Sequence, residues 1–207
     1  VYKPEKNENY RIEVNHSDYS SISAETYIPD DISLYNIDID TISSEEKIGF
    51  TFSFDDNASQ QNYYRLKLFS SCKKEWENED GDIEEWNFRG DTRFMSNDPS
   101  FPSEIPFEGY TFEGDNVVFT DALFNGQQKT ITLDVISDLK YADCDTIIIQ
   151  FSTFSDDTYS YYNSLGDHSE KGELSIFGGE VIPVYSNVEN GLGVLISTNA
   201  QQIYLKP

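Results

Sequence analysis

The sequence predicts a mainly β protein, an antiparallel β-sandwich with one short helix. Three observations support this fold class. Apolar and polar residues alternate with a period of two in several short segments, and turn-forming residues separate these segments. One segment alone combines a helix-capping residue with acidic residues directly after it. The chain has 207 residues, of which 37% are hydrophobic and 14% aromatic, so it can bury a hydrophobic core.

Two short strands are predicted near the start of the chain. Tyr10–Val14 alternates apolar with charged side chains, and Ile22–Ile28 has the same period until Pro29 ends it. Two strands cannot bury a core of their own. We therefore expect them to be the final strands of an incomplete β-rich domain.

A linker is predicted after these strands. The segment Asp30–Glu46 is polar, with scattered isoleucines and a Ser-Ser-Glu-Glu run. The predicted organisation is a partial N-terminal β domain with its linker over residues 1–40, and a β-sandwich domain over residues 41–207.

The strands of the predicted sandwich differ in how they are buried. Ile48–Phe54 shows the clearest alternation, and Tyr63–Phe69 follows it. Ile147–Phe151 is apolar except for Gln150, which is typical of a central strand buried on both faces. The last predicted strand is Gln202–Leu205.

Two segments of the sandwich are candidate hairpins. Lys73–Gly90 is predicted to form either a hairpin or a decorated loop. Val117–Phe119 and Lys129–Val135 flank the turn pair Asn125-Gly126, so a hairpin is expected there.

The single predicted helix begins after Ser155, which can cap it. Asp156 and Asp157 suit the positive end of the helix dipole, and Gly166 is expected to end the helix.

Charge and cysteine content exclude several classes of function. The chain carries 14 Lys and Arg against 38 Asp and Glu, a net charge of −24, which repels nucleic acid and anionic membrane surfaces. Cys72 and Cys144 are far apart, so they form neither a zinc knuckle nor a thioredoxin-type pair. They are either two buried free thiols or, in an exported protein, one disulfide.

Candidate catalytic residues are few. The two histidines are His16, in an expected turn, and His168, expected just after the helix, and neither belongs to a recognised motif. Glu84-Glu85 beside Trp86 is the carboxylate pair that most resembles a glycosidase site, although a surface loop is the better explanation of it. We therefore predict no catalytic residue.

A metal site and a ligand site are predicted from residue types. Asp80, Asp82 and Glu84 offer oxygen ligands at alternate positions, which suit calcium, although the frame of an EF-hand is missing. The candidate ligand-binding residues are aromatic side chains that can stack on a sugar or form a protein interface, namely Trp76, Trp86, Tyr159 and Tyr162.

One segment near the end of the chain has the character of a signature. Pro183–Gly193 is expected to form a strand, a sharp turn and a second strand that continues through Val194–Ile196. Asn190 and Gly191 tolerate positive φ, and Gly193 allows close approach of a neighbouring backbone. We expect Ser186, Asn187 and Glu189 to form hydrogen bonds within this turn rather than to contact a ligand.

This signature and other motifs, in this order, resemble a known family. The motifs are Tyr63–Leu66, Ser96–Phe101, Phe119–Gly126, Tyr161–Leu165 and Pro183–Gly193. Over roughly residues 8–200 the chain is similar to the Bacteroidetes cell-envelope lipoproteins catalogued as domain of unknown function 4249. Members are typically exported, lipidated on an N-terminal Cys and encoded beside TonB-dependent outer-membrane transporters.

The resemblance implies a preceding domain and a function. Members usually carry a β-rich domain before this region, so the first strands would end an incomplete immunoglobulin-like or carboxypeptidase-regulatory-like domain. The implied function is a non-enzymatic ligand-binding or docking accessory of an outer-membrane transporter, placed in the cell envelope. Its membrane contact would be a lipid anchor, which this chain lacks. The ligand would be a small molecule, a glycan or a peptide. A glycan-active enzyme and a structural or adhesion module are the alternatives.

Overall fold

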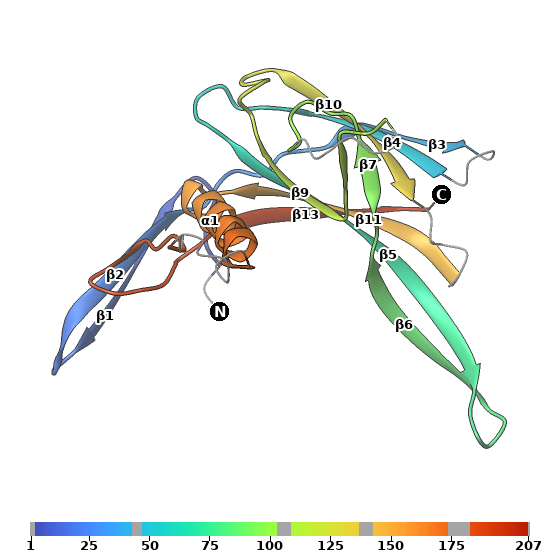
Figure 1. Ribbon diagram of the computed structural model, residues 1–207, viewed down its shortest axis with the longest axis horizontal. Helices are drawn as coiled ribbons and strands as arrows, with labels where there is room; N and C mark the ends of the chain where they lie inside the picture. The colour runs from blue at the N-terminus through green and yellow to red at the C-terminus, as the bar shows by residue number, and fades with distance from the viewer. Residues whose placement is uncertain (1–2, 43–46, 103–108, 137–142, 174–182, 207) are drawn as a thin grey trace. The chain divides into compact units, whose positions relative to one another are not determined.

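The computed structural model describes residues 3–42, 47–102, 109–136, 143–173 and 183–206 (Figure 1). Over these residues the protein is mainly β, with antiparallel sheets and one helix, so the predicted fold class is confirmed. No helix in this part of the chain is both long enough and apolar enough to cross a membrane. The chain forms two compact units, unit 1 (Val1–Asp31 and Thr153–Asn199) and unit 2 (Ile32–Ser152 and Ala200–Pro207).

Unit 1 contains a three-stranded sheet in the order β1-β2-β12. Its strands are β1 (Asn9–His16), β2 (Tyr19–Tyr27) and β12 (Val188–Glu189). β1 and β2 pair antiparallel, with Ile12 opposite Ala24 and Val14 opposite Ile22. The two strands predicted at the start of the chain are therefore confirmed, with bounds that differ by a few residues.

The helix of unit 1, α1 (Asp156–Glu173), starts as predicted and ends later. Ser155 caps it, because the Thr158 amide donates to Ser155 Oγ at 3.1 Å. The prediction that Gly166 ends the helix was wrong, and His168 lies within the helix rather than after it. A single glycine costs a helix only about 1 kcal/mol relative to alanine, which is too little to stop one that is otherwise supported.

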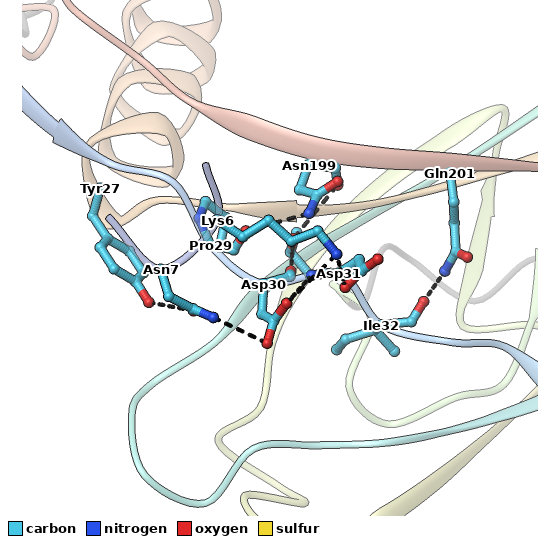
Figure 2. Close-up of polar contacts among 10 residues, drawn as sticks. Lys6, Asn7, Tyr27, Pro29, Asp30, Asp31, Ile32, Asn199 and Gln201 are labelled. Atoms are coloured by element: carbon cyan, nitrogen blue, oxygen red, sulfur yellow. Dashed lines mark hydrogen bonds and ion pairs between the residues drawn. The ribbon is translucent and has the colours of Figure 1, made fainter. Parts of the chain in front are cut away.

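A polar cluster follows the end of β2 in unit 1 (Figure 2). Lys6 forms ion pairs with Asp31 and, at 3.9 Å, with Asp30. Tyr27 donates to Asn7 Oδ1 at 2.6 Å, and Asn7 Nδ2 donates to Asp30 at 3.2 Å. The hydrogen bond from Lys6 lowers the pKa of the Asp31 carboxyl below its usual value. The cluster ties the residues before β1 to the segment that leaves β2.

Two amide side chains join the segments of each unit beside the points where the chain passes from one unit to the other. In unit 1, Asn199 donates to the Pro29 carbonyl at 3.4 Å. In unit 2, Gln201 donates to the Ile32 carbonyl, and Figure 2 shows both bonds. Each unit therefore binds its own incoming and outgoing chain together.

Unit 2 is built from two sheets. The first has the order β3-β4-β10-β7-β8 and the second the order β13-β11-β5-β6, with β9 also paired to β5. The strands of the first are β3 (Tyr35–Ile42), β4 (Lys47–Asp55), β10 (Gln128–Ile136), β7 (Phe94–Ser96) and β8 (Phe112–Gly114). Those of the second are β13 (Thr198–Leu205), β11 (Asp143–Phe154), β5 (Tyr63–Glu77), β6 (Ile83–Asp91) and β9 (Asn116–Thr120).

The core of unit 2 lies between these two sheets. Alternate side chains of β4 and β5 are completely buried, among them Phe52, Phe54, Tyr64 and Leu66, and they belong to one hydrophobic cluster. The ring of Phe54 lies 5.2 Å from that of Tyr64, which comes from the other sheet. In β11, Ile147, Ile148 and Ile149 are at most 1% exposed, so the prediction of a central strand buried on both faces is confirmed.

β3 occupies part of the segment expected to be a linker. Ile37 and Ile39 of this strand alternate with polar residues and pack against the core of unit 2. The prediction of a linker was therefore wrong for Tyr35–Ile42, because its scattered isoleucines have the two-residue period of a half-buried strand. The two compact units do not test the predicted domain division near residue 40, which stays a prediction.

The two hairpin predictions had different outcomes. Lys73–Gly90 does form a hairpin, in which β5 and β6 pair over nine residues each. The hairpin expected around Asn125-Gly126 was wrong, because β9 pairs with β5 whereas β10 pairs with β4 and β7. Gly126 does adopt the positive φ of a turn, at 70°. The buried ring of Phe124 fixes this connection in the core, where it crosses from one sheet to the other.

The signature segment forms less regular structure than its composition predicts. Asn190 has a positive φ of 58°, as expected, but Gly191 does not, and Val194–Ile196 is not a strand. The side chain of Asn187 takes the place of strand pairing. Its Nδ2 donates to the Glu25 and Leu195 carbonyls, both at 2.9 Å, and its Oδ1 accepts from the Leu195 amide at 2.8 Å. Asn187 therefore forms structural hydrogen bonds as expected, but its partners Glu25 and Leu195 lie outside the turn.

Candidate functional site

An exposed aromatic ribbon in unit 2 is the first candidate site. We call residues 73–77 and 83–87 of the β5–β6 hairpin the ribbon. Trp76 lies directly opposite Glu84, and Trp86 lies directly opposite Lys74. Opposite residues of an antiparallel pair point to the same side of the sheet. These four side chains, with Phe88, therefore share one side, which we call the inner face.

The inner face continues the core-facing side of β5. Even-numbered residues of β5 are buried from Tyr64 to Cys72, and Trp76 is the next large apolar residue in the same alternation. Trp76 is 41% exposed and Trp86 is 56% exposed. The ring of Trp86 stacks on that of Phe88 with centroids 5.0 Å apart. β5 therefore continues the alternation of a buried strand beyond its buried residues, up to the exposed Trp76.

The disulfide Cys72–Cys144 marks the base of the ribbon. β11 begins at Asp143, beside the bridge, so in this antiparallel sheet none of its residues lies opposite the end of β5. Among the described strands, β6 alone pairs with β5 beyond the bridge, and Figure 1 shows the two strands extending past the others. The two tryptophans are exposed where the described part of the sheet has two strands.

The outer face of the ribbon is charged. Lys73 lies 2.7 Å from Glu75 and 2.6 Å from Glu85 in two ion pairs. The hydrogen bond from Lys73 lowers the pKa of the Glu85 carboxyl below its usual value. Glu84 and Glu85 point to opposite sides of β6, so they do not face one another as a pair of catalytic carboxylates would.

The residues predicted to bind calcium lie at the end of the hairpin, with Asp80 and Asp82 in the turn between β5 and β6 and Glu84 on β6. Asn78 Oδ1 accepts hydrogen bonds from the Asp80 and Asp82 amides at 3.0 and 2.9 Å, and Asn78 Nδ2 donates to Glu84 at 3.0 Å. In the part of the chain that the structure describes, no group of three or more His, Cys, Asp or Glu side chains is arranged to hold a metal ion. The turn is organised by Asn78, and the calcium site stays a prediction.

The predicted ligand-binding residues fall into two sets. Trp76 and Trp86 lie together on the ribbon of unit 2. Tyr159 and Tyr162 lie on α1 of unit 1, where Tyr162 is 38% exposed and stacks on Phe154 with centroids 5.6 Å apart. The structure therefore brings each pair together separately.

A polar pocket in unit 1 is a second candidate site, which sequence analysis did not predict. It measures about 400 Å³ and is lined by Asn9, Arg11, Ser23, Ala24, Glu25, Thr26, Tyr27, Asp157, Asn187 and Glu189. A signal was present in the sequence, because Arg11, Glu13 and Glu25 occupy the polar positions of the two predicted strands. Its walls come from residues far apart in sequence, which no local pattern reveals.

The charges of this pocket pair with one another. Arg11 donates to Glu25 at 2.9 Å and to Ser23 Oγ at 3.0 Å, and Ser23 Oγ donates to Glu189 at 2.7 Å. The hydrogen bond with Glu25 raises the pKa of the Arg11 guanidinium. These hydrogen bonds link β1, β2 and β12 to one another. Because the charged groups pair among themselves, the pocket alone indicates no ligand.

One tyrosine near the pocket is expected to lower the stability of unit 1 as the pH becomes alkaline. Tyr185 donates to Asp157 Oδ1 at 2.6 Å, and this bond raises its pKa from 10.0 to about 12. The neutral phenol is favoured in the folded state, so its stabilising contribution is complete below pH 10 and is lost as the pH rises towards 12. We expect Tyr185→Phe to be less stable than the parent at about pH 9, with a smaller deficit at about pH 11.5, as measured by urea unfolding. An equal deficit at both pH values would contradict this.

Comparisons with known proteins complete the description of the site. No curated protein and no solved structure matches the chain. One family model matches residues 1–203, which is nearly the whole chain and includes both candidate sites. The chain belongs to the family described as "Domain of unknown function (DUF4249)".

Proposed function

We propose that this chain is the non-catalytic, ligand-capturing module of an exported lipoprotein that serves a TonB-dependent transporter in the outer membrane. The observation that carries this proposal is the exposed inner face of the ribbon. Binding proteins expose aromatic side chains where they meet a partner, because these rings contribute a large contact area at low entropic cost. On the described surface, Trp76 and Trp86 are two large rings on the same side of one hairpin.

The disulfide supports a location outside the cytosol. Disulfides form and persist in oxidising compartments, such as the bacterial cell envelope, and are rare where thiol reductants are abundant. Cys72 and Cys144 are the only two cysteines of the chain, and they are bonded to one another. In such a compartment the bridge would stay oxidised and would hold β5 and β11 together at the base of the ribbon.

The arrangement of the acidic residues favours binding over hydrolysis. Glycoside hydrolysis uses two carboxyl groups that flank one bond, and one of them has a raised pKa. Beside Trp86, the neighbouring carboxylates Glu84 and Glu85 lie on opposite sides of β6, and Lys73 lowers the pKa of Glu85. This pair is therefore a poor acid and base for such a reaction.

Co-purification tests the proposed function. The complete lipoprotein, with an affinity tag, is expressed in its own host together with the transporter encoded beside its gene, and mild detergent extracts are purified on the tag. We expect the transporter to co-purify with it and not with a tagged lipoprotein of unrelated fold. If the transporter is recovered equally from both, the proposal of a transporter accessory is wrong.

A further inference from the structure

We propose that the inner face of the ribbon binds an uncharged glycan chain, whose sugar rings stack on Trp76 and Trp86. This inference rests on the proposed function and names the ligand class that the module captures. It follows from four properties of the inner face: the exposure of its rings, its hydrogen-bonding groups, its charge and its size.

The rings are placed for stacking. Trp76 and Trp86 are diagonal neighbours across the strand pair, since Trp76 pairs with Glu84 and Trp86 follows Glu84 by two residues. Diagonal neighbours lie about 7–8 Å apart, so two successive sugar rings of a chain can each contact one indole. The apolar C–H face of a sugar ring covers an exposed aromatic face and removes both from water. Stacking by Phe88 holds the ring of Trp86 in place.

Each ring has a hydrogen-bonding group beside it. Glu84 is directly opposite Trp76, and Lys74 is directly opposite Trp86. Their carboxylate and ammonium can bond the hydroxyl groups at the edge of a stacked sugar. Asn78 Nδ2 donates to Glu84 Oε1 at 3.0 Å, so part of the cost of ordering this side chain is already met before a ligand binds.

The charge of the inner face favours an uncharged ligand. Its one positive side chain, Lys74, and its one negative side chain, Glu84, cancel, whereas the whole chain has a net charge of −24. An anionic ligand is repelled by the protein as a whole. A cationic ligand would be attracted to the many acidic surfaces and would not be selected by this one. A hydroxyl-rich, apolar-faced molecule matches what the inner face offers.

The size of the inner face also favours a glycan over a protein partner. Five residue pairs at about 3.4 Å per residue make a face about 17 Å long, and two strands make it about 10 Å wide. The resulting area, on the order of 200 Å², is far below the roughly 800 Å² per partner of a stable protein interface. Two to four sugar rings cover such a strip.

The experiment uses the two tryptophans as their own reporters. Trp76 and Trp86 are the only tryptophans in the chain, so all of its intrinsic tryptophan emission comes from the inner face. The intact protein is titrated with maltohexaose, cellohexaose, mannohexaose, xylohexaose and chitohexaose, and in parallel with apolar and acidic peptides. We expect saturable shifts of the emission with at least one glycan. If only the peptides shift the emission, or if nothing does, the proposal is overturned.

Matched variants of the ribbon assign the signal to the inner face. We expect Trp76→Ala and Trp86→Ala each to weaken glycan binding by about tenfold or more, the effect typical of a central contact residue. Ile83→Ala, which removes a 74% exposed apolar side chain from the outer face, should leave the affinity unchanged. Calorimetry measures affinity without the tryptophan signal, and circular dichroism checks that each variant is folded. Equal affinities of all three variants would overturn the proposal.

The outcomes separate this inference from the proposed function. If the transporter co-purifies but no glycan binds, the glycan assignment fails and the accessory function stands. If a glycan binds with the expected dependence on Trp76 and Trp86 but the transporter does not co-purify, the site stands and the transporter assignment fails. Loss of transporter binding in the two tryptophan variants, without any glycan binding, would make the inner face a protein contact and overturn the proposal.

Discussion

Replacing Cys72 and Cys144 with alanine should lower the free energy of unfolding by about 4 kcal/mol, because the bridge closes a loop whose ends are 72 residues apart. An unfolded chain without this crosslink has more conformations, and a loop of this length gives a large entropy difference. The loop contains much of unit 2, including β6 and β10, so we expect the loss to appear in the unfolding of its core.

Urea unfolding with and without a reductant measures this effect. The parent protein should shift to a lower urea midpoint when a reductant is added, and the double alanine variant should not respond to the reductant. The reduced parent and the variant should then agree. A variant as stable as the oxidised parent would contradict the expected role of the bridge.

Replacing Lys129 with methionine should cost about 3–5 kcal/mol, because it leaves a charge unpaired in a largely buried site. Lys129 Nζ lies 2.7 Å from Asp98 Oδ1, and the two side chains are only 12% and 7% exposed. Asp98 Oδ1 also accepts a hydrogen bond from the Ser100 amide at 2.8 Å, which keeps the carboxylate in place. Without the lysine, the carboxylate loses its counter-charge and has little water around it.

A second lysine in the same unit provides a matched control. Lys67 pairs with Asp91 at 3.1 Å, and like Lys129 its ammonium lies over a phenylalanine ring. Its side chain is 22% exposed and that of Asp91 is 53% exposed, so solvent screens this pair. We expect Lys67→Met to cost no more than about 1 kcal/mol. Similar losses in the two variants would show that burial of the ion pair does not set its importance.

The fold could be predicted to the level of its strands, but not of their pairing. The alternation in Ile48–Phe54 and the apolar run Ile147–Phe151 are local patterns, and both became strands with the predicted burial. The pairing of β9 with β5, in place of the expected hairpin with β10, depends on which faces are buried together in the core. The separation of two strands along the chain does not indicate whether they pair.

The candidate site was predicted in its residue types and not in its geometry. Residue type alone predicts Trp76 and Trp86 as contact residues, and their shared face follows from the register of β5 and β6. Glu84 and Glu85 are neighbours in sequence and resemble a pair, whereas a strand places such neighbours on opposite sides. The polar pocket around Arg11 was missed, because its walls come from β1, β2, α1 and the signature segment.

The sequence by itself determined the fold class, most of the strands, the start of the helix and the family. These depend on periodicity, capping and motif order, which are local properties of the chain. The tertiary structure alone decided that the cysteines are bonded, that Asn187 joins its segment to Leu195, and that the core-facing side of β5 emerges uncovered at Trp76. These features depend on which distant strands become neighbours, and that is settled by the burial of the whole core at once.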